Sequence, residues 1–169
     1  MIFSLHTFTI VHVVISLIGI GSGLVVMFGL LKAKLLDRWT ALFLTSTVAT
    51  SVTGFFFPFH GFTPAIAVGI ISLVILAVAI LARYGRRLAG PWRWIYVICA
   101  MLAQYLNVFV LIVQLFQKVP VLKAMAPTQS EPPFLLTQLI VLALFIVLTI
   151  VSAIKFHIEP AGAPAVRTA

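Results

Sequence analysis

Residues 94–116 have the sequence WIYVICAMLAQYLNVFVLIVQLF, which contains no Lys, Arg, Asp or Glu. An apolar stretch of this length predicts a transmembrane helix, because at about 1.5 Å per residue it crosses a hydrocarbon core of about 30 Å. Four other stretches without these charged residues lie at about 8–31, 40–57, 65–82 and 134–154. The sequence therefore predicts an all-α fold, a polytopic transmembrane helix bundle with five spans. The spans would form a single transmembrane domain over residues 1–157, followed by a flexible tail over 158–169.

The amino-acid composition is that of a membrane protein. Of the 169 residues, 63% are hydrophobic and only 8% are charged, whereas about a quarter of the residues in a soluble domain are charged. The net charge of +8 would suggest a nucleic-acid partner in a soluble chain. Here the basic residues lie in short segments between apolar runs, where they set topology and contact anionic headgroups. We therefore expect the lipid bilayer, and not nucleic acid, as a partner.

The basic residues are distributed unevenly between the two sides of the expected bundle. Two of them, Lys118 and Lys123, lie between the fourth and fifth spans. The other nine lie in segments that five spans would bring to the opposite side: Lys32, Lys34, Arg38, Arg83, Arg86, Arg87, Arg93, Lys155 and Arg167. Because Lys and Arg are enriched in cytoplasmic loops, the N-terminus is expected outside and the C-terminus in the cytoplasm.

Two connections on the expected outer side have distinctive sequences. PFHGFTP, at 58–64, joins the second and third spans, and its Thr63 and Pro64 suit the N-cap and first position of a helix. QKVPVLKAMAPTQSEPP, at 117–133, joins the fourth and fifth spans. Within it, VPVLKAMA is expected to form one or two helical turns at the membrane surface. This longer connection is the best candidate for contacting another protein, although a semi-rigid linker is an equal alternative.

One face of the 94–116 helix is polar. At about 100° per residue, Tyr96, Gln104, Asn107 and Gln114 fall within an arc of about 80°. Carboxamides that faced lipid would lack hydrogen-bond partners, so this interior stripe is expected to face other helices or a small aqueous cavity. Two interpretations remain open, namely structural packing and the lining of a solute path.

The first span carries a second pattern, in which His12, Ser16, Gly19 and Gly23 share one stripe. The two glycines favour close approach of another helix. His12 and His60 both fall on the expected outer side, and a neutral imidazole is a common ligand of metal ions and of haem. They are therefore candidate cofactor-binding residues for haem b, a quinone or a metal ion, with hydrogen bonding to nearby groups as the plain alternative.

The expected spans contain no Lys, Arg, Asp or Glu, whereas proton relays, ion-coupled carriers and voltage sensors depend on such residues. No catalytic residue is predicted. The segments VGIISLVILAVAILARYGR and NVFVLIVQLFQKVP resemble those of small multi-pass bacterial inner-membrane proteins, which implies that localisation and assigns no functional residue. Three hypotheses follow: a non-enzymatic accessory or structural subunit with a membrane-protein partner or a second copy, a redox or metal-handling protein, and a passive carrier or channel for a neutral solute.

Overall fold

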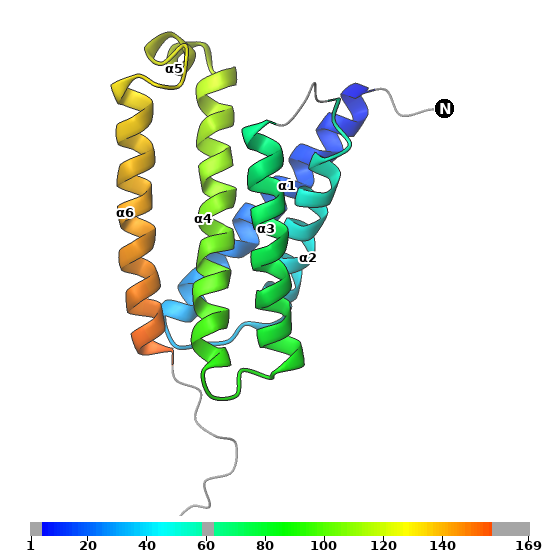
Figure 1. Cartoon of the computed structure of the whole chain (residues 1–169), viewed down its shortest axis with the longest axis vertical. Coiled ribbons are helices and arrows are strands. Elements are labelled where there is room, and N and C mark those ends of the chain that lie inside the picture. Colours follow the sequence, from blue (N-terminus) through cyan, green and yellow to red (C-terminus); the bar gives the residue numbers. More distant parts are fainter. Residues whose placement is uncertain (1–4, 59–62, 157–169) are drawn as a thin grey trace, which may run out of the picture.

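The computed structural model describes residues 5–58 and 63–156, and within these ranges every regular element is helical (Figure 1). The elements in chain order are α1 (Leu5–Leu31), α2 (Asp37–Gly54), α3 (Pro64–Ile80), the π-helical turn η1 (Leu81–Gly85), α4 (Trp92–Lys118), α5 (Pro120–Met125) and α6 (Pro132–Lys155). The all-α prediction is confirmed for the described residues. The expected tail, 158–169, lies outside them.

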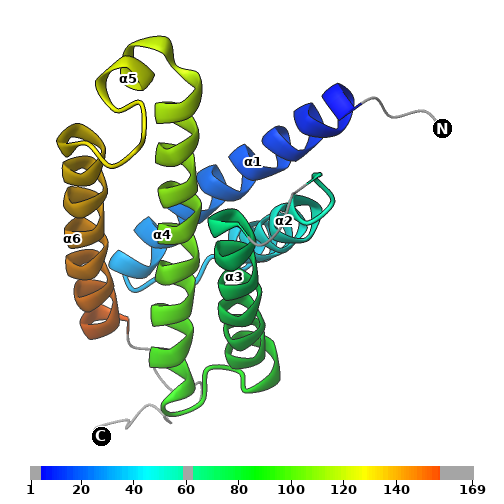
Figure 2. The same ribbon diagram turned by 45° about the horizontal axis from the view of Figure 1, so that its top comes forward.

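Four helices are long and apolar enough to cross a membrane: α1, α3 continued by η1, α4 and α6. α3, α4 and α6 stand side by side, whereas α1 crosses behind α4 at an oblique angle with α2 alongside it (Figures 1 and 2). α1 contacts α2, α4 and α6, so it ties the two groups of helices together.

α2 differs from the other long helices and is not among those four. It has 18 residues, begins with Asp37 and Arg38, and contains eight residues that are Ser, Thr or Gly, which lower its hydropathy. Its end is also earlier than the sequence suggested. The helix stops at Gly54, and the amides of Phe55 and Phe56 close it with bonds to the Val52 and Thr53 carbonyls.

The connections follow the local chemistry of their residues. Thr63 accepts a hydrogen bond from the Ile66 amide and Pro64 takes the first helical position, so the predicted N-cap of α3 is confirmed. The short helix expected within VPVLKAMA is also present, as α5.

The charged residues of the described chain divide between two ends of the bundle. One end holds the end of α1, the start of α2, η1, the start of α4 and the end of α6 (Figure 1). It contains eight of the ten basic residues in the described ranges: Lys32, Lys34, Arg38, Arg83, Arg86, Arg87, Arg93 and Lys155. We call it the basic end. The opposite end holds Lys118 and Lys123, together with α5.

Candidate functional site

Polar side chains from α1, α2 and α4 meet between these helices. We call this set the polar seam, and it consists of Thr40, Thr47 and Thr53 of α2, Tyr96, Gln104 and Asn107 of α4, and His12 of α1. From Thr40 to Thr53 the seam follows α2 for about 20 Å. It begins near the basic end, where the hydroxyls of Thr40 and Tyr96 lie 3.3 Å apart. Both side chains are fully buried, so this bond satisfies groups that have no access to water.

Gln104 occupies the next position along the seam. Its Nε2 donates to the backbone carbonyl of Ile20 on α1 at 3.0 Å, and the residue is only 1% exposed. Its Oε1 is buried without a hydrogen-bond partner in the described chain. A Cβ on Gly23 would stand 1.9 Å from this oxygen, so the carboxamide fills the notch that the glycine leaves.

Asn107 lies one turn further along α4. Its Nδ2 donates to Oγ1 of Thr47 at 3.1 Å. A Cβ on Gly19 would stand 3.2 Å from the same Thr47 oxygen and 3.3 Å from Oγ of Ser46. The two glycines of the first span therefore face α2 and α4 closely, which confirms that this stripe packs against other helices.

His12 closes the seam at the opposite end. Its Nδ1 lies 2.8 Å from Oγ1 of Thr53, and this hydroxyl also donates to the carbonyl of Ala49 at 2.7 Å. With the hydroxyl proton on the Ala49 carbonyl, the His12 tautomer that carries its proton on Nδ1 would donate to Thr53 and leave the lone pair of Nε2 free. The imidazole is half-buried, with its edge against the Phe57 ring at a centroid distance of 5.0 Å.

The structure therefore brings together three of the four residues of the predicted interior stripe, namely Tyr96, Gln104 and Asn107. The expectation for Gln114 is wrong, because that side chain is exposed. α1 leans away from the end of α4 that leads to α5 (Figure 2). His60 lies outside the described residues.

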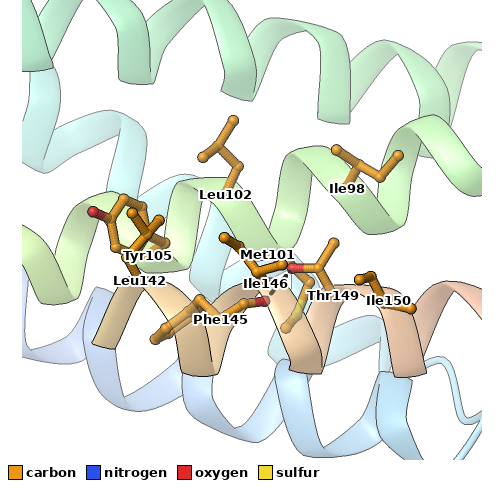
Figure 3. Close-up of a pocket in the computed structure, with 9 residues that line it drawn as sticks. All are labelled: Ile98, Met101, Leu102, Tyr105, Leu142, Phe145, Ile146, Thr149 and Ile150. Carbon is orange, nitrogen blue, oxygen red and sulfur yellow. Dashed lines mark hydrogen bonds between the residues drawn. The ribbon is translucent and has the colours of Figure 1, made fainter. Parts of the chain in front are cut away.

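α6 adds one polar contact of its own to α4. Nε2 of Gln138 donates to the carbonyl of Phe109 at 3.3 Å. Below this contact, an apolar groove of about 240 Å³ runs between the two helices (Figure 3). It is lined by Ile98, Met101, Leu102 and Tyr105 of α4 and by Leu142, Phe145, Ile146, Thr149 and Ile150 of α6. The Thr149 hydroxyl is bonded to the Phe145 carbonyl, so the groove presents little polarity.

Sequence reasoning missed a set of contacts at the basic end. Arg83 pairs with Asp37, which links η1 to the start of α2. The guanidinium groups of Arg86 and Arg93 lie over the rings of Trp92 and Trp94, at 5.1 and 5.0 Å from the ring centroids. The neighbouring Arg and Trp residues were a signal for the stacking, whereas no spacing rule joins residues as distant as 37 and 83.

Within the described residues there is no group of three or more His, Cys, Asp or Glu side chains that would hold a metal ion. His12 is thus a single ligand candidate there. Comparisons with protein-family models, with curated proteins and with solved structures give no significant match for this chain.

Proposed function

We propose that the protein is a small non-enzymatic subunit of the bacterial inner membrane that assembles with another membrane protein. The observation that carries the proposal is that the polar side chains of α4 bond within the protein: Tyr96, Gln104 and Asn107 each bond to another helix. Interhelical bonds of this kind hold a bundle together. They argue against a neutral-solute path, which would need the same groups to face a hydrated space.

The proposed topology has five spans, with α2 as the second. At about 1.5 Å per residue α2 is about 27 Å long, close to a hydrocarbon core of about 30 Å. Four of its hydroxyl groups have partners within the bundle, whereas Oγ1 of Thr50 is buried without one in the described chain. Ser46 and Thr53 donate to carbonyls of their own helix, and Thr40 and Thr47 bond to α4. Its two charged residues stand at its first turn, at the basic end, where headgroups would surround them.

The proposed orientation places the basic end in the cytoplasm and the start of α1 outside. Its support is the charge distribution, with eight basic residues at one end of the described chain and two at the other. Trp39, Trp92 and Trp94 belong to the same end, as expected of rings at a headgroup boundary.

The proposed contact surface for the partner is the connection between α4 and α6, on the outer side. Contacts within the chain hold this segment in place: Gln129 donates to the Val113 carbonyl at 3.1 Å, and Ala126 is fully buried in a cluster with Ile112, Phe116 and Phe134. α5 nevertheless presents two large apolar side chains, Val121 at 70% exposure and Met125 at 51%. An ordered connection that exposes apolar side chains is typical of an interaction surface.

Photo-crosslinking in intact cells tests this surface. A photoreactive amino acid in place of Val121 should give one discrete protein adduct, whereas the same group in place of Val74, 60% exposed on α3, should give lipid adducts only. The adduct should disappear with Met125→Glu and survive Val74→Leu. If the Val121 probe yields only lipid adducts, the assembly proposal fails at this surface. A doubly tagged strain separates a second copy of the chain from a different protein.

A second function is favoured by the geometry of His12. In the tautomer that donates Nδ1–H to Thr53, this bond fixes the ring and leaves Nε2 as a ligand atom, which is the arrangement usual for metal- and haem-binding histidines. In this proposal His12 and His60 hold haem b or a metal ion near the outer surface. An oxidised-minus-reduced optical spectrum with metal analysis, repeated on His12→Ala and His60→Ala, should then show a band or metal that both substitutions remove. A featureless spectrum without metal excludes haem and metal binding.

A further inference from the structure

The basic end carries more positive charge than the described chain neutralises. The described residues contain two acidic side chains, Asp37 and Glu131. Asp37 pairs with Arg83, and Glu131 lies at the opposite end of the bundle. An excess of positive charge at the level of the headgroups attracts anions from the membrane surface.

The segment that carries much of this charge has a fixed conformation. Leu88, 5% exposed, anchors the loop between η1 and α4 in the core, and its amide donates to the Ala82 carbonyl at 3.0 Å. Arg87, Leu88 and Gly90 have φ angles of 49°, 59° and 54°, which close the loop tightly before α4 begins. The start of α4, with Arg93 in its first turn, is thereby held in place.

The described residues supply no carboxylate partner for the guanidinium of Arg93. Its guanidinium lies over the Trp94 ring at 5.0 Å, which orients the group at the membrane surface. Its Nε is buried and has no hydrogen-bond partner among the described residues. A guanidinium that is partly withdrawn from water gains most from a phosphate, which accepts two parallel N–H bonds from it.

An apolar surface begins at the next residue, Trp94, over whose ring the guanidinium lies. Trp94, Ile98 and Tyr105 follow one another on one face of α4, and Ile98 and Tyr105 line the groove between α4 and α6. Figure 3 shows Ile98 and Ile150 at one end of the groove and Tyr105 near Leu142 at the other. From Arg93 to Tyr105 α4 rises about 18 Å. This length is close to the thickness of one membrane leaflet, which is half of a hydrocarbon core of about 30 Å together with part of the headgroup layer.

We propose that Arg93 and the α4/α6 groove together form a binding site for an anionic phospholipid, with the phosphate on Arg93 and one acyl chain over Ile98 and Leu102. The phosphate group is common to lipids and to soluble phosphates. The groove favours a lipid over a soluble phosphate, because only a lipid has an acyl chain to fill the apolar space of about 240 Å³. The site is independent of the proposed partner surface, which lies at the opposite end.

The experiment uses the full chain in a neutral detergent, with phosphatidylglycerol as the probe and native mass spectrometry as the readout. One retained phosphatidylglycerol is expected, with phosphatidylcholine bound at least about ten-fold more weakly. Arg93→Gln should weaken retention by about ten-fold, as the loss of a hydrogen bond to a charged group predicts. Lys123→Gln, which removes the same charge at the opposite end, should leave it unchanged.

Further arms separate the sources of phosphate and guard against misfolding. Inorganic phosphate and glycerophosphoglycerol, which lack acyl chains, should not displace the lipid at equal concentration. Leu102→Trp, which fills the groove without altering charge, should also weaken retention, and both variants should unfold within a few degrees of the wild type in neutral detergent. Equal retention by Arg93→Gln and wild type, or displacement by free phosphate, would overturn the proposal. So would an acidic protein, and not lipid, bound at Arg93.

Discussion

Gly23 of α1 and Gln104 of α4 share one space, because a Cβ on the glycine would stand 1.9 Å from the carboxamide oxygen. It would also stand 2.8 Å from Cδ2 of Phe43, a fully buried side chain of α2. Three helices therefore meet at this glycine. The carboxamide cannot withdraw without breaking its bond to the Ile20 carbonyl.

Gly23→Ala is expected to destabilise the bundle by about 1–3 kcal/mol, the usual cost of overpacking, with the lost Gln104 bond in addition. Gly21→Ala is the matched control. Nothing lies within 4 Å of a Cβ on Gly21, so that change should be neutral or should stabilise the helix by up to about 1 kcal/mol. Reversible denaturation in mixed micelles measures both variants, and equal stabilities would contradict the packing described at Gly23.

The bond between Asn107 and Thr47 predicts a coupling between α4 and α2. Asn107→Ala, Thr47→Val and the double variant should give an interaction free energy of about 0.6–1.7 kcal/mol, the range known for hydrogen bonds inside membranes. Gln114→Ala should change the free energy of unfolding by less than about 0.5 kcal/mol, because that side chain is exposed. A zero coupling energy would mean that Asn107 faces water or a solute, in favour of the path.

The interior stripe illustrates what the sequence can predict. Helical period gives the phase of each residue on its own helix, so it groups Tyr96, Gln104 and Asn107 on one face, and all three side chains bond to neighbouring helices. Period does not report how far along a helix a neighbouring helix covers that face, and the side chain of Gln114 is exposed. The same reasoning explains the success at Gly19 and Gly23, where a glycine pattern implies close contact whatever the partner helix is.

Other features depend on which elements meet, and a single sequence does not contain that information. The pair of Arg83 and Asp37 joins residues on different helices, and the α4/α6 groove exists only because those two helices are neighbours. The lower hydropathy of α2 was present in its hydroxyl residues. The expected span was defined by its lack of Lys, Arg, Asp and Glu, a criterion that hydroxyl residues do not affect.

Glu131 predicts a pH dependence in the connection between α5 and α6. Desolvation acts to raise the pKa of its carboxyl, but hydrogen bonds from the amide and hydroxyl of Thr128 and from the Ser130 amide outweigh it and lower the pKa. A lowered pKa stabilises the folded connection at pH values above the ordinary pKa of Glu, and this stabilisation is lost as pH falls through the lower, folded value.

Amide exchange at Thr128 and Ser130 measures this effect. After correction for intrinsic rates, protection should be constant from neutral pH to about pH 5 and should fall below about pH 4.5, the unperturbed range of Glu. Glu131→Gln should show the weaker protection at every pH, without the transition. A transition of the same size in Glu131→Gln would assign it to another group.

The crossing by α2, the second of the five proposed spans, is tested by the accessibility of single cysteines in a Cys99→Ser background. With five spans and the proposed orientation, a membrane-impermeant thiol reagent added to spheroplasts should label His6→Cys, Phe56→Cys and Thr128→Cys. Arg86→Cys should react only after permeabilisation. Phe56 is well suited as a reporter, because it is 71% exposed directly after α2.

If α2 lay along the membrane surface, four spans would remain, and His6 and Phe56 would fall on opposite sides. Labelling of His6→Cys without Phe56→Cys, or the reverse, would therefore exclude α2 as a span. Agreement of these two sites, with Arg86→Cys on the opposite side and Thr128→Cys back on theirs, would support crossings by α1, α2, α3 and α4.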